Sequence, residues 1–198
     1  MMKKKIVYLF AGLMIASTMS AAMVGCDSTN QTTSSQTAST TSKTDSKTES
    51  KAESTGTTFT SSDKSYSFTI PEGFTETNVP AGTIPTGGTG VAFTNADNVA
   101  LISVSVKGGS ADMSGLTKDT LEKQMQAQYP GAKISDYTTE KKGKGNVFTY
   151  KLDVPTNGTS IGMVQSTYTD ADRTINFTIN DANSLKTMQS VMDSLEIK

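Results

Sequence analysis

The sequence predicts an α+β domain in which an antiparallel sheet of about six to seven strands packs against two main helices. Three observations lead to this prediction. Short segments between residues 66 and 179 alternate apolar and polar residues, which is the period of a strand. Turn-forming pairs such as Asn157-Gly158 separate some of these segments, as expected of antiparallel neighbours. Residues 117–129 and 184–195 instead space their apolar residues three or four apart, which indicates amphipathic helices.

The first predicted strands lie before residue 107. Residues Tyr66–Ile70 alternate apolar and polar side chains, and Pro71-Glu72-Gly73 ends the run. Val79–Gly90 is rich in Gly, Pro and Thr and predicts a long loop. Residues 91–94 and 99–106 then predict a hairpin.

The first helix has the clearest start signal in the chain. Thr117 is the expected N-cap, Asp119 lies in the first turn, and Leu116 precedes the cap as one half of a hydrophobic staple. Pro130-Gly131 ends the helix. Its predicted buried stripe is Leu121, Met125 and Tyr129.

The rest of the domain predicts four strands and a closing helix. The strands are expected at 134–140, 146–154, 159–169 and 173–179. The helix, Ser184–Leu195, is expected to dock on the sheet because one of its faces is apolar. That face comprises Leu185, Met188, Val191, Met192 and Leu195.

Residues 1–25 predict a lipoprotein signal peptide. Lysines 3–5 precede the uncharged segment Ile6–Ile15, the order of a secretory leader. The sequence Met23-Val24-Gly25-Cys26 resembles the lipobox of bacterial lipoproteins, whose usual pattern is Leu, a small residue, Gly or Ala, and Cys. Gly25 and Cys26 match it. The resemblance implies cleavage between Gly25 and Cys26 and a diacylglycerol on the thiol of Cys26, the single cysteine of the chain.

Two other interpretations of the leader stay open. Ile6–Val24 is nearly long enough to remain as an uncleaved membrane anchor. Ordinary secretion with cleavage after Ala22 would leave Cys26 as a free thiol. We prefer lipidation because a single cysteine at this position fits a lipid attachment site best, and several acyl chains hold a protein stably on a membrane. We therefore expect a lipid anchor on the extracytoplasmic face of the cell membrane.

Residues 26–57 predict a disordered tether. They are rich in Ser and Thr, and the later part alternates lysine with acidic residues. Because almost no apolar side chain is available for burial, nothing offsets the entropy lost on ordering. Residues 58–198 are then long enough for one globular domain.

The composition excludes several chemistries. There is no histidine, which removes Ser-His and Cys-His nucleophile pairs and the commonest zinc ligand. The domain keeps 12 of the 18 basic residues, since three lie in the leader and three in the tether, and 15 of the 19 acidic ones, since four lie in the tether. A net charge of −3 argues against a nucleic-acid surface. We expect no catalytic residue, metal or cofactor.

A few motifs remain as candidates. Ser61 and Lys64 have the Ser-x-x-Lys spacing, but the partner motifs of that enzyme class are missing. Asp170 and Asp172 are more simply explained as turn residues than as calcium ligands. Three lysines around one predicted hairpin tip, Lys141, Lys142 and Lys144, form a possible polyanion contact or an ordinary solvated turn.

The order of elements resembles the PsbP-like family. The resemblance rests on the opening Tyr66-Ser-Phe-Thr-Ile-Pro-Glu-Gly-Phe74, a helix after the first hairpin, three later strands and a closing helix that runs into Ser194-Leu-Glu-Ile197. This chain has Phe74 where the family often has tryptophan. The resemblance implies an α/β/α sandwich and binding rather than catalysis. No functional residue of the family has a matching position here.

These observations predict a lipid-anchored, extracytoplasmic, non-catalytic binding or scaffold domain. Its partners are expected to be the membrane, through diacylglycerol on Cys26, and another envelope protein or assembly, but no nucleic acid. The contact surface would be a sheet edge or the loop Val79–Gly90. The alternative is a small-ligand-binding lipoprotein that acts with a membrane transporter.

Overall fold

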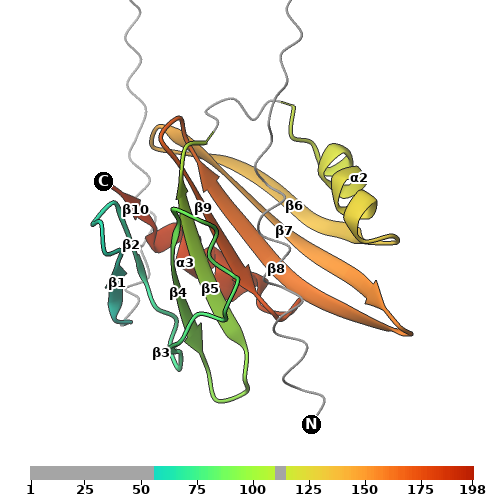
Figure 1. Cartoon of the computed structure of the whole chain (residues 1–198), viewed down its shortest axis with the longest axis horizontal. Helices are drawn as coiled ribbons and strands as arrows, with labels where there is room; N and C mark the ends of the chain where they lie inside the picture. The colour runs from blue at the N-terminus through green and yellow to red at the C-terminus, as the bar shows by residue number, and fades with distance from the viewer. Residues whose placement is uncertain (1–55, 110–114) are drawn as a thin grey trace, which may run out of the picture. The chain divides into compact units, whose positions relative to one another are not determined.

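The computed structural model describes residues 56–109 and 115–198, so Gly25, Cys26 and the leader lie outside the described residues. The described residues form a seven-stranded sheet, a three-stranded sheet and two helices (Figure 1). Neighbouring strands of the large sheet are antiparallel throughout. In spatial order they are β3 (Thr75–Thr77), β4 (Thr89–Thr94), β5 (Ala100–Lys107), β9 (Arg173–Ile179), β8 (Thr159–Thr169), β7 (Gly145–Thr156) and β6 (Lys133–Lys142).

The small sheet joins the start and the end of the described domain. Its strands are β1 (Thr58–Thr60), β2 (Tyr66–Thr69) and β10 (Glu196–Ile197), with β2 in the middle. Phe59 pairs with Phe68 across one side of β2, and Ile197 pairs with Tyr66 across the other. The rings of Phe59 and Phe68 lie 5.2 Å apart.

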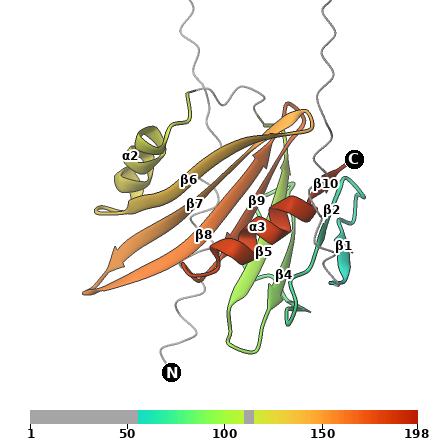
Figure 2. The ribbon, with the colours of Figure 1, turned by 180° about the vertical axis from the view of Figure 1, so that it is seen from behind.

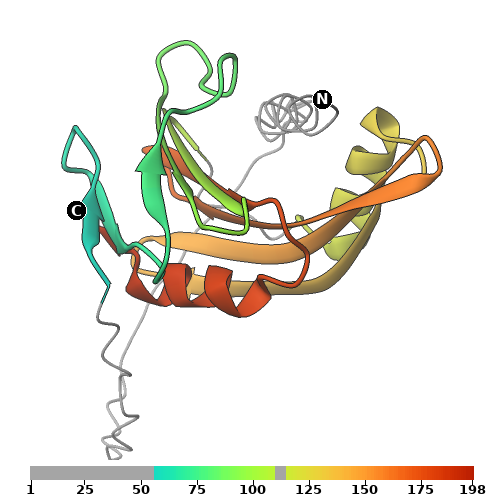
Figure 3. The same cartoon turned by 90° about the horizontal axis from the view of Figure 1, so that it is seen from below.

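The large sheet is covered on both faces. Helix α3 (Leu185–Ser194) lies across one face together with β2 (Figure 2). Helix α2 (Lys118–Gln128) packs on the other face beside β6 (Figure 3). The larger hydrophobic cluster, which we call the α3 cluster, includes Phe68, Phe93, Phe177, Met188 and Val191. The second, the α2 cluster, includes Leu121, Met125, Phe148, Leu152 and Met163. The predicted α/β/α arrangement is confirmed.

Both helices begin and end close to the predicted residues. The Thr117 side chain accepts a hydrogen bond from the backbone N–H of Thr120 at 3.2 Å, which caps α2. Leu121 and Met125 of the predicted stripe are buried, and Tyr129 is the C-cap. Within residues 56–109 and 115–198, no helix is long and apolar enough to cross a bilayer.

The hairpin of β7 and β8 also follows the prediction. Asn157 and Gly158 have positive φ angles of 38° and 86°, as a two-residue turn of this kind requires. The alternate side chains of β7 point to opposite faces: Phe148 and Leu152 belong to the α2 cluster, whereas Val147 belongs to the α3 cluster.

The structure differs from the predicted strands in three ways. The segment from Tyr66 forms β2 of the small sheet rather than a strand of the large one, because its backbone pairs with β1 and β10 while its side chains pack beside α3 on one face of the large sheet. Strands β1, β3 and β10 were not predicted, since two or three residues carry no readable period. Strand β6 extends to Lys142, so the hairpin tip is shorter than expected.

Candidate functional site

The structure separates the three predicted lysines. Lys142 is the last residue of β6, and only Gly143 and Lys144 separate it from β7. The Lys142 Nζ donates hydrogen bonds to the backbone oxygens of Met192 and Asp193, the latter at 3.3 Å. These are carbonyls of the last turn of α3, where the negative end of the helix dipole lies. The Met192 oxygen also accepts from the backbone N–H of Leu195, the C-cap residue, at 3.2 Å. Lys142 therefore caps α3.

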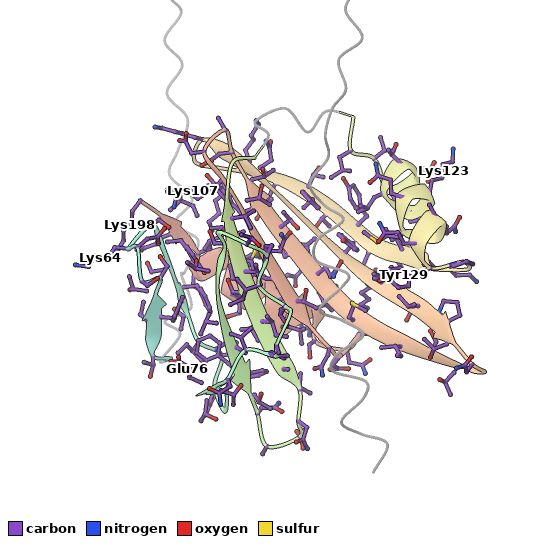
Figure 4. All side chains as sticks on the ribbon, in the orientation of Figure 1. Lys64, Glu76, Lys107, Lys123, Tyr129 and Lys198 are labelled. Carbon is purple, nitrogen blue, oxygen red and sulfur yellow. The ribbon has the colours of Figure 1, made fainter. Side chains whose placement is uncertain are left out.

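Lys141 and Lys144 stay exposed. Successive side chains of a strand point to opposite faces, so Lys141 points away from the α3 face that Lys142 occupies. Lys64, Lys107 and Lys198 lie towards the same end of the domain (Figure 4). Acidic residues lie there as well. Asp172 is near Lys107, because its backbone oxygen accepts a hydrogen bond from the N–H of Gly108, and Glu196 in β10 is near Lys198. This end is therefore mixed in charge.

An aspartate organises the turn between β1 and β2. Asp63 Oδ1 accepts from the hydroxyls of Ser61 and Ser65, both at 2.7 Å, and from the backbone N–H of Ser65 at 3.1 Å. The hydroxyls of Ser61 and Ser65, which favour the ionised carboxylate, lower the pKa of Asp63 to about 2. The Ser-x-x-Lys spacing of the sequence therefore belongs to a structural turn, in which Lys64 has a positive φ of 57°.

A second polar cluster holds the small sheet against the large one. The hydroxyl of Tyr168 donates to Asp170 Oδ2 at 2.7 Å, and Asp170 Oδ1 accepts from the backbone N–H groups of Asp172 and Arg173. Burial raises the pKa of Asp170, but these hydrogen bonds outweigh it and the net pKa is lowered. Arg173 Nη1 donates to the backbone oxygen of Ser65 at 3.0 Å. Asp170 and Asp172 thus serve a turn, as the sequence indicated.

The α2 face of the sheet carries a buried polar row that the sequence did not predict. Tyr150 donates to Gln165 Oε1 at 2.6 Å, and Thr167 donates to Asn176 Oδ1 at 2.7 Å. Burial raises the pKa of Tyr150, so the phenol stays protonated and remains a donor. Because these side chains satisfy one another, the row acts as a polar layer of the interior.

The loop between β3 and β4 contains two consecutive tight turns. The N–H of Thr83 donates to Pro80 O at 3.2 Å, and the N–H of Gly88 donates to Pro85 O at 2.9 Å. Gly82 and Gly87 stand at the third positions of these turns with φ angles of 80° and 79°. This geometry is that of type II turns, which favour glycine there. We call Pro80–Gly88 the double turn.

The double turn displays one apolar side chain. Ile84, which lies between the two turns, is 37% exposed and is the one large apolar side chain that is exposed among residues 56–109 and 115–198. It rests against Gly90, where a Cβ would lie 3.0 Å from Ile84 Cγ1. The preceding Val79 packs on Ala92, Ile102 and Val104. The loop is thereby fixed to the face opposite α3 (Figure 3).

Two further features set this loop apart. The hydroxyl of Thr83 is buried and has no hydrogen-bond partner, and Thr83 as a whole is 1% exposed. The twenty residues Thr77–Ala96 contain no Asp, Glu, Lys or Arg, in a chain that is 19% charged. The glycines and prolines predict the loop, but they do not single out Ile84 or Thr83. The signal that marks them is the repeated Pro-x-Gly at Pro80 and Pro85 on either side of Ile84.

The described residues contain no group of three or more His, Cys, Asp or Glu side chains placed to hold a metal ion. Two salt bridges occur in this part of the chain, Lys118 with Glu122 at 3.8 Å and Lys151 with Asp136 at 2.8 Å. Both are at least partly exposed, and such pairs contribute about 1 kcal/mol or less to stability.

Comparison with known proteins finds similarity in three-dimensional structure. The sequence matches no protein-family model and no curated protein. The cyanobacterial PsbP protein CyanoP of Synechocystis sp. PCC 6803 is similar with a TM-score of 0.52 and 16% identity, over 72% of this chain and 92% of that chain. A Bacteroides thetaiotaomicron protein has a TM-score of 0.48 and 17% identity, over 72% of this chain and 48% of its own.

LpqN of Mycobacterium tuberculosis, a protein involved in cell envelope biogenesis, gives a TM-score of 0.42 and 12% identity over 74% of this chain and 87% of its own. Of these three, CyanoP alone carries the fold assignment, because its TM-score of 0.52 is above 0.5 and the similarity covers 92% of that chain. The element order, the sheet between two helices and this similarity agree. The domain has a PsbP-like fold.

Proposed function

We propose that this protein is a lipid-anchored, extracytoplasmic lipoprotein whose PsbP-like domain binds another envelope protein and has no catalytic turnover of its own. The observation that carries the proposal is the order of parts. A leader and Cys26 come first, a Ser/Thr-rich stretch follows, and the first strand begins at Thr58, directly after that stretch. A domain attached in this way is kept at the membrane surface and gains local concentration towards membrane-bound partners.

The length of the tether supports contact with a partner that stands off the bilayer. A flexible chain of about thirty residues has a mean span of ~30 Å and a stretched reach of ~100 Å. Acyl chains supply the membrane attachment, since each buried CH₂ contributes ~0.8 kcal/mol. The domain itself then needs no membrane-binding surface.

A protein partner is favoured over a small ligand by the placement of the exposed apolar side chain. Ile84 stands on a loop that projects from the sheet, whereas the polar groups of the same face are paired with one another. Exposed apolar side chains that are held in one position fill pockets on other proteins. A small ligand would instead be expected inside a concave site.

The lysine hairpin has a smaller place in the proposal. Lys141 and Lys144 are exposed and can contact an anionic envelope polymer, whereas Lys142 is engaged with α3. Such a contact would be weak and sensitive to salt, because both charges are solvated.

The proposal is tested by comparing the full-length chain with its Cys26→Ser variant in the native host. Intact cells are cross-linked, membranes are isolated, and complexes that contain the chain are measured. We expect the wild type in the membrane fraction and in a cross-linked complex with an envelope protein, and the variant to lose both. Equal complex formation by an unanchored variant would contradict the role of the anchor.

A further inference from the structure

We infer that the double turn Pro80–Gly88 is the element that recognises the partner, and that the partner is a protein with an uncharged, apolar pocket for Ile84. The inference rests on the proposed function and specifies its contact surface. Three independent properties of the same loop carry it: the exposure of one apolar side chain, the rigidity of the backbone that presents it, and an unpaired buried hydroxyl.

The first property concerns Ile84 itself. Its side chain is exposed although it is apolar, whereas Val79 of the same loop packs on the sheet. It does not hang free, because Gly90 lets it lie flat on β4. An apolar side chain held in one place loses little conformational freedom on binding, which is how anchor residues at interfaces contribute most of the affinity.

The second property is the rigidity of the loop. Both turns close with backbone hydrogen bonds, and Pro80 and Pro85 restrict the backbone at their first positions. The loop connects β3, which ends at Thr77, to β4, which begins at Thr89, and it is fixed at Val79 and at β4. It is therefore preorganised, which lowers the entropy lost on association.

The third property is the hydroxyl of Thr83. A buried hydroxyl without a partner is unfavourable, and valine at this position would remove that cost without a change of shape. Thr83 is 1% exposed, so its hydroxyl meets a partner only if its side chain rotates about χ1 while the backbone of the double turn stays in place. Because Thr83 Oγ1 makes no hydrogen bond where it lies, this rotation breaks none. A protein surface offers backbone donors and acceptors for such a group, whereas the hydrocarbon of a bilayer offers none.

The charge pattern defines the partner surface. With no ionisable side chain from Thr77 to Ala96, the loop and the strand beneath it offer nothing to a charged surface. Placing charges against them would desolvate those charges without compensation. The matching partner surface is therefore apolar, with uncharged hydrogen-bonding groups at its rim.

The test uses a photoreactive benzophenone amino acid in the full-length, anchored chain, irradiated in intact cells. The probe is placed at Thr86, which is exposed beside Ile84, and a control probe at Thr159, which is exposed in the β7–β8 hairpin. We expect the Thr86 probe to give an adduct with one envelope protein that the Thr159 probe does not give. Ile84→Asp should lower its yield at least tenfold, and Ile84→Val should retain most of it.

Thr83→Val separates a recognition role from a structural one. We expect this variant to raise the Tm by roughly 2 to 4 °C, because an unpaired buried hydroxyl is removed, and to lower the adduct yield several-fold. A Tm that falls together with the yield would mean that Thr83 serves the fold, and would overturn its part in recognition. The Tm of Ile84→Asp is also measured, to show that this variant is folded and that its lower adduct yield is not caused by unfolding.

The other outcomes also decide. An adduct unaffected by Ile84→Asp, an adduct with lipid, or an adduct with a second copy of the chain would overturn the inference. An adduct from the Thr159 probe alone would place the partner elsewhere on the domain, so that the proposed function stands and the role of the double turn fails. If neither probe gave an adduct while the cross-linked complex still depended on Cys26, the proposed function would likewise stand and the role of the double turn would fail.

Discussion

Lys142 illustrates how a single side chain takes its role from a distant part of the fold. From the sequence it is one of three lysines near a turn, and its charge alone suggests a surface contact. In the structure its ammonium group lies at the C-terminal end of α3, fifty residues further along the chain, where two carbonyls accept its hydrogen bonds. Its neighbours Lys141 and Lys144 have exposed side chains.

This arrangement gives a prediction for substitutions of the lysines. Lys142→Met keeps the aliphatic stem but removes the ammonium group, and should lower the free energy of unfolding by about 1 kcal/mol. Lys144→Met, the matched control, should change it by less than ~0.5 kcal/mol. Urea denaturation of both variants measures the difference. Equal effects would show that Lys142 does not cap α3.

Asp63 gives a prediction about pH. Its carboxylate is stabilised by Ser61 and Ser65, so its pKa in the folded state is about 2, below the ordinary value of 3.8. A carboxylate with a lowered pKa stabilises the folded state at pH values above its ordinary pKa. This stabilisation is lost as the pH falls from about 4 to about 2. Asp170 and Asp181 also have lowered pKa values and lose stability in acid by the same mechanism.

The share of Asp63 is isolated by Asp63→Asn. At pH 7 this variant should have a lower Tm than the wild type, because the neutral amide accepts the hydroxyl hydrogen bonds less strongly. The two Tm values should converge as the pH is lowered through the range from 4 to 2, where the wild-type carboxylate is protonated. Thermal unfolding across this range measures the gap. A gap that stays constant would contradict the role given to the carboxylate.

At the scale of elements, close packing at the start of β7 makes Gly145 sensitive to any side chain. A Cβ there would lie 2.5 Å from the backbone oxygen of Thr169 and 2.6 Å from the ring of Tyr168. That ring is buried and its hydroxyl is bound to Asp170, so it cannot move without breaking the polar cluster. Gly145→Ala should therefore lower the free energy of unfolding by about 2 kcal/mol or more.

Gly115 provides the control for this prediction. A Cβ at Gly115 meets nothing within 4 Å. Gly115→Ala should leave stability unchanged or raise it by a few tenths of a kcal/mol, since alanine restricts the unfolded chain. Denaturant midpoints of the two variants give the comparison, and similar losses in both would argue against tight packing at β7.

The elements that could be predicted from the sequence are those with local signals. Thr117 and Pro130-Gly131 mark the ends of α2, and Asn157-Gly158 marks the turn between β7 and β8, because the chemistry of each turn or cap lies within a few residues. Strands β1, β3 and β10 escaped prediction because they are only two or three residues long and exist through pairing with a longer strand, which for β10 is the distant β2. Their formation depends on tertiary contacts rather than on periodicity.

The candidate site divides in the same way. Glycines and prolines indicated a loop at Val79–Gly90, and the structure has a loop there that ends earlier, because Thr89 and Gly90 belong to β4. The exposure of Ile84 and the burial of Thr83 depend on where the loop rests on β4 and β5, which a single sequence does not reveal. Likewise, the polar row on the α2 face is assembled from β7, β8 and β9, and its pairing follows from strand register.

At the scale of the whole molecule, packing and hydrogen bonds stabilise the domain without a disulfide. Residues 27–198 contain no cysteine, so no disulfide is possible within them. The two hydrophobic clusters on opposite faces of the large sheet provide the packing that stabilises the fold. The single cysteine lies in the lipobox-like sequence, and the account therefore depends on what is attached to it.

The most direct measurement is the intact mass and N-terminal sequence of the mature protein extracted from host membranes with detergent. The account predicts a chain that begins at Cys26 and carries diacylglycerol on its sulphur, with labelled palmitate incorporated. A mature chain found in the medium, beginning after Ala22 and bearing a free thiol, would contradict it.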